Sequence, residues 1–233
     1  MPTYRLTVAY DGTDFHGWAA QPGLRTVARE LAAALEIEPR ELTVAGRTDT
    51  GVHAEANVVS LAADRLIPVP ALNRRLPADV AVRDAAEVPD AFDARRDAHT
   101  RSYVYRLCAA SVPDPLRSRY ELHHPRPPDL AALEACAAAV MGVHDFTAFT
   151  PTETGHVHFD RTVLAAEWRR EGDRLEFRIT ADAFLRHMVR VLVGTMLDRP
   201  EPEHLTTLLT GRPRSHAGRT APSHGLTLTA VTY

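Results

Sequence analysis

Apolar and polar positions follow two different periods along the chain. Alternation at every second residue is typical of half-buried strands, and repetition at i, i+3 and i+4 is typical of helices. The strand pattern predicts strands at residues 3–12 (ending in an Asp-Gly turn signal), 42–45, 56–61, 80–88, 102–107, 162–169, 174–180 and 225–232. The helical pattern predicts helices at residues 26–35, 70–76, 130–141, 183–197 and 203–209.

Both halves of the chain therefore mix strands with helices, which predicts an α+β fold of two lobes. The 233 residues are enough for one large domain or two of ordinary size. We place the boundary between residues 1–108 and residues 109–233. Residues 114–129 contain four prolines and are predicted to be a connection. Because ligands often bind between lobes, we expect the functional site in a cleft between them.

The composition is that of a globular protein, with 45% hydrophobic and 24% charged residues. Cys108 and Cys136 lie far apart without a CxxC pairing, which predicts inert thiols in a reducing compartment. The first residues carry no apolar targeting segment, and no run approaches eighteen apolar residues. We therefore predict a cytoplasmic protein without a membrane anchor.

The charge pattern leaves a nucleic-acid partner open. The net charge is −3, but all 27 basic residues are arginines. Arginine suits phosphates and base edges, although a GC-rich genome produces the same bias. The last stretch, residues 204–233, carries Arg212, Arg214 and Arg219 and no acidic residue. This segment is either a phosphate-contacting surface or a plain basic tail.

Residues 44–53, VAGRTDTGVH, hold an arginine and an aspartate between two glycines. Gly46 and Gly51 allow close approach of another backbone or a ligand. Arg47 and Asp49 are then either solvated residues of a surface turn or reactive groups in a constrained loop. Spacing alone does not separate these two interpretations.

The segment AFLRHMVRVLVGTML predicts a buried helix whose only polar stripe holds Arg186, His187 and Arg190. A buried guanidinium keeps its proton and therefore needs a carboxylate or a phosphate. Asp49 is a candidate partner, and such a pair would keep Asp49 ionised. The alternatives are a purely structural salt bridge and an Arg186 that reaches solvent.

Six segments resemble, in order, motifs of the tRNA pseudouridine synthase A family. The loop segment AGRTDTGVHA resembles the family signature around its catalytic aspartate. The other five are YDGTDFHGW (10–18), FDARRDAHTRSYVYRL (92–107), HDFTAF (144–149), AFLRHMVRVLVG (183–194) and APSHGL (221–226). Because six segments occur in the family's order over most of the chain, chance is an implausible explanation.

The resemblance implies a role for five residues. Asp49 corresponds to the nucleophile and Arg190 to its ion-pair partner. Tyr103 would stack on the target uracil, Arg47 would hold the nucleotide swung out of the RNA stack, and Leu226 would line the base pocket.

The resemblance also implies a fold, a partner and a substrate. The fold would be two ferredoxin-like α+β lobes that share a continuous, mostly antiparallel sheet with helices on one side. The implied assembly is a homodimer around a basic cleft, acting on uridine in the anticodon stem-loop of tRNA without a cofactor or metal. Two departures from the family, Thr50 for the usual alanine and Ala19 for a common glutamine, affect substrate detail more than chemistry.

Three other interpretations are kept. A metal site is suggested by His123-His124 and by the segment 156–158, although neither has accompanying ligand spacing. A tRNA-binding module without activity would need no carboxylate in the cleft. A glycosidase would need a second acid near Asp49, and no motif marks one.

Overall fold

A computed structural model describes residues 1–64 and 68–233. The chain divides into two compact units, one formed by Met1–His99 with Thr227–Tyr233 and the other by Thr100–Leu226. This division differs from the boundary we predicted after residue 108. Residues 100–108 belong to the second unit because they pair with a strand of that unit, and the last strand joins the first unit because it pairs there.

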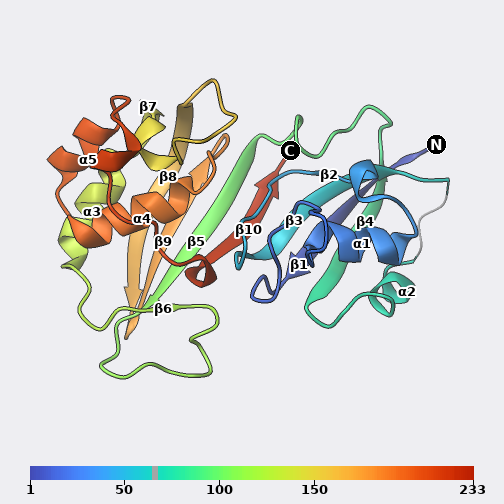
Figure 1. Cartoon of the computed structure of the whole chain (residues 1–233), viewed down its shortest axis with the longest axis horizontal. Coiled ribbons are helices and arrows are strands. Elements are labelled where there is room, and N and C mark those ends of the chain that lie inside the picture. Colours follow the sequence, from blue (N-terminus) through green and yellow to red (C-terminus); the bar gives the residue numbers. More distant parts are fainter. Residues whose placement is uncertain (65–67) are drawn as a thin grey trace. The chain divides into compact units, whose positions relative to one another are not determined.

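The first unit combines strands of a sheet with the helices α1 (Val27–Leu35) and α2 (Val69–Asn73) (Figure 1). Its sheet order is β4-β1-β3-β10, and β2 pairs with β3. The pairs within β1–β4 are antiparallel, whereas β10 runs parallel to β3. The elements are β1 (Thr3–Tyr10), α1 (Val27–Leu35), β2 (Thr43–Val44), β3 (His53–Ala62), α2 (Val69–Asn73), β4 (Val80–Val88) and β10 (Leu226–Thr232).

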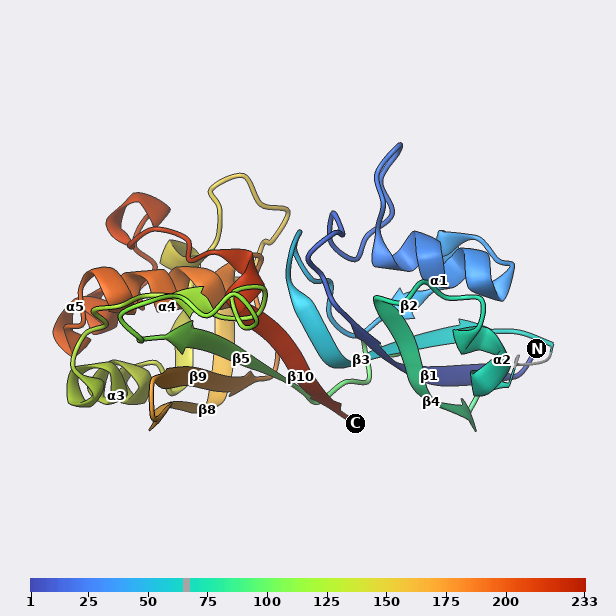
Figure 2. The ribbon, with the colours of Figure 1, turned by 90° about the horizontal axis from the view of Figure 1, so that it is seen from below.

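Both faces of this sheet carry apolar side chains. Helix α1 lies over one face (Figure 2), and its stripe of Val27, Leu31 and Ala34 is buried, as the helical periodicity predicts. On β3, Val58 belongs to a small cluster with Ala45 and Ala94, against which Phe92, Val231 and Tyr233 pack. Because side chains from both faces of β3 are buried, residues 57–61 are buried without interruption.

In the second unit the strand order of the sheet is β5-β9-β8-β7, and the short β6 runs parallel to β5. The pairs β5–β9, β9–β8 and β8–β7 are antiparallel. The elements are β5 (Thr100–Cys108), β6 (Leu122–His123), α3 (Leu130–Ala139), β7 (Gly142–Asp145), β8 (Asp160–Glu171), β9 (Arg174–Ala181), α4 (Met188–Asp198) and α5 (Pro202–Leu208). The α+β class and the mostly antiparallel pairing within each unit are confirmed.

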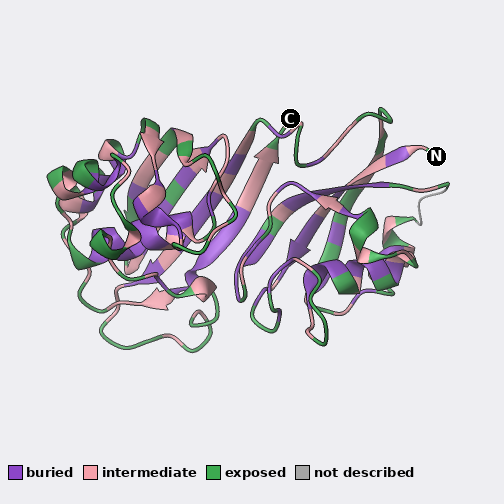
Figure 3. Ribbon diagram, turned by 45° about the horizontal axis from the view of Figure 1, so that its top comes forward, coloured by how far each residue is buried: buried purple, intermediate pink, exposed green. Residues whose placement is uncertain are grey.

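The core of the second unit lies between its sheet and α4, which is buried along nearly all of its length (Figure 3). Trp168 of β8 packs on Phe177 of β9, with ring centroids 5.2 Å apart. Its indole Nε1 donates to the sulfur of Met196 in α4 at 3.3 Å. Cys108 and Cys136 are free and buried, whereas the sequence left open whether these thiols lie in the core or at the surface.

Two predicted elements differ from the structure. The helix predicted from residue 183 begins at Met188, because His187 has a left-handed backbone with φ of 63° and interrupts the helical path. The segment after α3, for which the sequence pattern predicted neither a strand nor a helix, contains β7, which pairs with β8. Along the described residues, no helix has the length and apolar character to cross a membrane.

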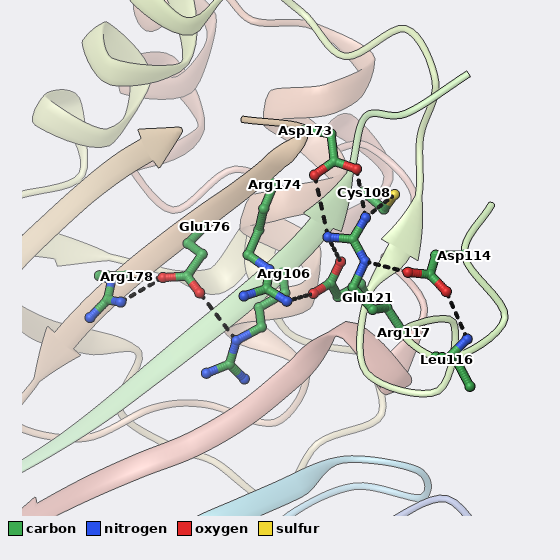
Figure 4. A network of polar contacts seen from close by, with 10 residues as sticks. All are labelled: Arg106, Cys108, Asp114, Leu116, Arg117, Glu121, Asp173, Arg174, Glu176 and Arg178. Atoms are coloured by element: carbon green, nitrogen blue, oxygen red, sulfur yellow. Dashed lines mark hydrogen bonds and ion pairs between the residues drawn. The ribbon is translucent and has the colours of Figure 1, made fainter. Parts of the chain in front are cut away.

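The connection at residues 109–129 is fixed to the second unit by a polar network (Figure 4). The Arg117 guanidinium binds Asp173 at 2.6 Å and Asp114 at 3.1 Å. Glu121, whose side chain is only 2% exposed, contacts Arg117 at 3.7 Å and also Arg174. A buried carboxylate with two guanidinium partners satisfies the need for compensating charge.

Candidate active site

Asp49 lies in the loop between β2 and β3 of the first unit. Its side chain is half-buried, Thr48 is buried and Arg47 is exposed. Among the described residues, Arg47 has no hydrogen bond or ion pair, so its guanidinium is available to a ligand. The loop therefore presents a carboxylate and a free cation two residues apart.

The segment YDGTDFHGW forms the support of this loop. The backbone N–H of Trp18 donates to the Thr48 carbonyl at 3.0 Å, and the N–H of Gly51 donates to the Phe15 carbonyl at 3.3 Å. Gly17 has φ of +83°, and a Cβ there would lie 2.7 Å from the Thr48 oxygen. Glycine is needed at this position for its conformation and for the close approach.

The C-terminal end of the Asp49 loop also contacts the YDGTDFHGW segment. A Cβ on Gly12 would lie 2.0 Å from the Val52 oxygen, so the two backbones are in direct contact. The N–H of Gly12 donates to Nδ1 of the buried His53 at 3.0 Å. The same Nδ1 lies 3.2 Å from Oδ1 of Asp11. Two motifs distant in sequence thus form one structural unit.

A buried polar network reaches the loop from the sheet. The Tyr10 hydroxyl and the Thr48 hydroxyl are 2.8 Å apart. The Asn57 amide nitrogen donates to the Tyr10 hydroxyl at 3.1 Å and to the Gly46 carbonyl at 2.8 Å. These contacts connect Gly46 and Thr48 to β1 and β3. Gly46 directly precedes Arg47, and Thr48 directly precedes Asp49.

Arg190 lies in the first turn of α4 in the second unit and is half-buried. Its Nε donates to the Ala221 carbonyl at 2.8 Å, and the Ala221 N–H donates to the Arg190 carbonyl at 3.0 Å. The guanidinium is therefore oriented by the APSHGL segment. Arg186 is exposed and precedes the helix, so the predicted helical stripe of Arg186, His187 and Arg190 is wrong. The pairing of Arg190 with Asp49 stays a prediction.

Tyr103 and Leu226 are both in the second unit and both mostly buried, with 8% and 5% exposure. The edge of the Tyr103 ring meets Phe184 at 5.0 Å between centroids. Leu226 follows Gly225, where a Cβ would lie 2.7 Å from the Tyr105 ring. The Tyr105 hydroxyl donates to the Pro222 carbonyl at 2.8 Å. β5 thus supports the segment that carries Leu226.

Two other sequence features have structural explanations. In HDFTAF, the Asp145 carboxylate accepts the N–H and the hydroxyl of Thr147 at 2.8 and 2.6 Å. In the basic stretch, Arg214 binds the Thr220 hydroxyl at 3.1 Å and Arg219 pairs with Asp198 at 3.0 Å. These two arginines are thus engaged inside the unit, and Arg212 is exposed.

The histidines suggested for a metal are not grouped with other ligands. His123 contacts the Ala110 carbonyl at 2.9 Å through Nε2. Within residues 1–64 and 68–233, no group of three or more His, Cys, Asp or Glu side chains is arranged to hold a metal ion.

Sequence reasoning assigned no role to Tyr10 or Asn57. Tyr10 begins the segment YDGTDFHGW, but the sequence does not show where its hydroxyl points. Asn57 was detectable as an amide next to two valines in the predicted strand. A buried amide must be hydrogen-bonded, which indicates a network without naming the partners.

The family model and the curated relatives that match this chain point to the same family. The family model described as tRNA pseudouridine synthase matches residues 136–233. The tRNA pseudouridine synthase A of Moorella thermoacetica is 41% identical over 246 residues and is covered completely, as is this chain. That of Halalkalibacterium halodurans is 40% identical, over 97% of this chain and 90% of the relative. That of Bacillus subtilis is 36% identical, over 98% of both chains.

Among solved structures, the chain aligns with a chain from a Cbf5-Nop10-Gar1 complex. The identity is 14% and the TM-score is 0.40. The alignment covers 97% of this chain and 48% of that one. The likeness is weak.

Proposed function

Because the chain belongs to the tRNA pseudouridine synthase A family, we propose that it isomerises uridine to pseudouridine in tRNA with Asp49 as the catalytic carboxylate. The observation that carries this proposal is the 41% identity to one relative over the whole chain. The geometry of that loop supports it, because two motifs fix a half-buried carboxylate beside an unpaired cation.

The reaction is an internal rearrangement of the nucleoside. The N1–C1′ bond breaks, the uracil turns, and a C5–C1′ bond forms. The C5 proton leaves to solvent and N1 takes up a proton, so no atoms are gained or lost overall. An ionised carboxylate can attack C1′ or take a proton from the ribose. Both routes require Asp49 to be charged and aligned with the sugar.

Arg190 is proposed as the cation that faces Asp49 during the reaction. A guanidinium stays charged at any physiological pH and would keep the neighbouring carboxylate ionised. The Ala221 carbonyl orients its Nε, which supports a directional role for the guanidinium.

Three further residues are proposed to hold the flipped nucleotide. Stacking of uracil on Tyr103 would contribute roughly 1–3 kcal/mol and so offset part of the few kcal/mol needed to extrude the base. Leu226 would contact the base from the start of β10. Arg47, exposed and unpaired in the described part of the chain, would bind a phosphate of the extruded nucleotide.

The test of Asp49 is tritium release from tRNA labelled at uridine C5. We expect Asp49→Asn to release no tritium above background while it still binds tRNA. Asp84→Asn is the matched control, since Asp84 is an aspartate of the same unit with 62% side-chain exposure. Turnover of Asp49→Asn near the wild-type rate would remove this residue from the mechanism. Carbodiimide labelling of the product separates pseudouridine from the free base that a glycosidase would release.

Arg190 is tested by Arg190→Leu, which should fold and lose most of its activity. Arg169→Leu is the control, because Arg169 is exposed on β8 and its ion pair is with Glu167 of the same strand. If Arg190→Leu turns over at the rate of Arg169→Leu, Arg190 does not face the reacting carboxylate.

We further propose that the target lies in the anticodon stem-loop, that the protein acts in the cytoplasm, and that it works as a homodimer. These proposals rest on the family resemblance of the six motifs. Pseudouridine mapping of tRNA from cells that lack the gene tests the target, and loss outside the anticodon arm would contradict it. Light scattering of the purified protein tests the dimer, and a monomer mass would exclude it.

A further inference from the structure

The polar network beneath the Asp49 loop has a definite direction. The Gly46 carbonyl can only accept, so the Asn57 atom that faces it at 2.8 Å must be the amide nitrogen. The Val58 N–H can only donate, so the atom that faces it at 3.0 Å is the Asn57 oxygen. The contacts therefore fix the amide orientation of Asn57. Its second amide hydrogen points to the Tyr10 oxygen.

The network continues from Tyr10 into the loop. The Tyr10 oxygen accepts from Asn57 and also lies 2.8 Å from the Thr48 hydroxyl, where either hydroxyl can donate. The series Asn57 to Tyr10 to Thr48 thus ends one residue before Asp49. A branch from the same amide ends on Gly46, three residues before Asp49.

All three side chains of the network are buried. Asn57 is 0% exposed, Tyr10 4% and Thr48 7%. The Tyr10 ring also lies beside the Trp18 ring, and the backbone N–H of Trp18 donates to the Thr48 carbonyl. Side-chain and backbone contacts therefore restrain the same residue from two directions.

We propose that Tyr10 and Asn57 are positioning residues that set the place of the Asp49 carboxylate through Thr48 and Gly46. This inference rests on the proposed function of Asp49. The polar atoms of both side chains are bonded to Thr48, to Gly46 and to each other, so their effect is on alignment in the reaction and not on tRNA affinity. Misplacement of a reacting group by about 1 Å costs on the order of 100-fold in rate.

The network does not act as an acid or base in the physiological range. Burial, opposed by the hydrogen bonds to Thr48 and Asn57, raises the pKa of Tyr10 to about 12. Removal of the hydroxyl should therefore lower the maximum of the pH–rate profile without moving its apparent pKa values. A displaced profile would assign proton transfer to Tyr10 and overturn the positioning role.

The kinetic experiment uses Tyr10→Phe, Thr48→Val and the double variant in single-turnover assays at saturating tRNA. We expect each single variant to be slower by on the order of 10- to 100-fold, with the tRNA dissociation constant within about twofold of wild type. Because the two residues act as one unit, the double variant should be no slower than the slower single variant. Independent, multiplicative effects would refute the proposed connection.

Two further variants complete the design. Tyr233→Phe is the matched control, since it also deletes one tyrosine hydroxyl of the first unit, here bonded to the Ala94 carbonyl at 2.8 Å. Thr48→Ser keeps the hydroxyl and should retain most of the rate. A Tyr10→Phe rate equal to that of Tyr233→Phe would overturn the inference.

Hydrogen exchange distinguishes failure of this inference from failure of the proposed function. Amides of residues 46–53 should exchange faster in Tyr10→Phe and Thr48→Val than in wild type or Tyr233→Phe. If wild type forms no pseudouridine, the proposed function fails, and exchange still decides whether the network fixes the loop. Unchanged exchange in both variants would refute the inference whatever the activity.

Discussion

Substitution of Gly17 by alanine should displace the Asp49 loop directly. The added Cβ would lie 2.7 Å from the Thr48 oxygen, 3.2 Å from the Asp49 carbonyl carbon and 3.2 Å from the Thr50 nitrogen. All three atoms belong to backbone, so no flexible side chain can move aside. Ordinary van der Waals contact begins near 3.4 Å, so the shortest contact requires a movement of about 0.7 Å.

A control variant with the same backbone strain separates the effect of this movement on catalysis from its effect on stability. The φ of +83° at Gly17 costs an alanine roughly 1–2 kcal/mol of folding free energy. Gly23 has a similar φ of +73° but nothing within 4 Å of its Cβ position. Gly23→Ala is therefore the matched control, with the same backbone strain and no pressure on the loop.

The assay combines single-turnover tritium release with urea unfolding. We expect both variants to lose roughly 1–2 kcal/mol of unfolding free energy from the backbone strain. Only Gly17→Ala should also lose activity, by about 10- to 100-fold for a shift below 1 Å. Equal rates for the two folded variants would show that the loop tolerates the displacement and would refute the reasoning.

Three more predictions concern stability. The raised pKa of Tyr10 means that the folded state holds this proton longer than the unfolded state, so the unfolding free energy should fall between pH 10 and 12 by about 3 kcal/mol. Urea titrations of Tyr10→Phe should lack that part of the slope. Burial and, to a smaller extent, the charge of Arg190 lower the pKa of His224 below 6.5, so stability should fall as the pH drops below 6.5. His224→Gln should flatten this acid dependence, and an unchanged slope would contradict the assignment. Asp145→Ala should cost about 1–2 kcal/mol in urea unfolding, because the N–H and the hydroxyl of Thr147 both lose their carboxylate acceptor.

The sequence alone predicted most strands and helices because their burial repeats locally. The strand at 80–88 and the turn between β8 and β9 follow directly from alternation and a Glu-Gly-Asp signal. The Asp49 loop was also recognisable, since its glycines and polar residues are adjacent in the chain. Local patterns carry this information without reference to distant residues.

The tertiary structure decided what depends on residues far apart in the chain. The start of α4 is set by the left-handed backbone of His187, which apolar periodicity does not reveal. The last strand joins the first unit because β10 pairs with β3, across more than 160 residues of sequence. Tyr10, Thr48 and Asn57 form their network because the pairing of β1 with β3 brings them together. A hydrogen bond of this kind depends on angles and distances within about 3 Å, and these exist only once the sheet has formed.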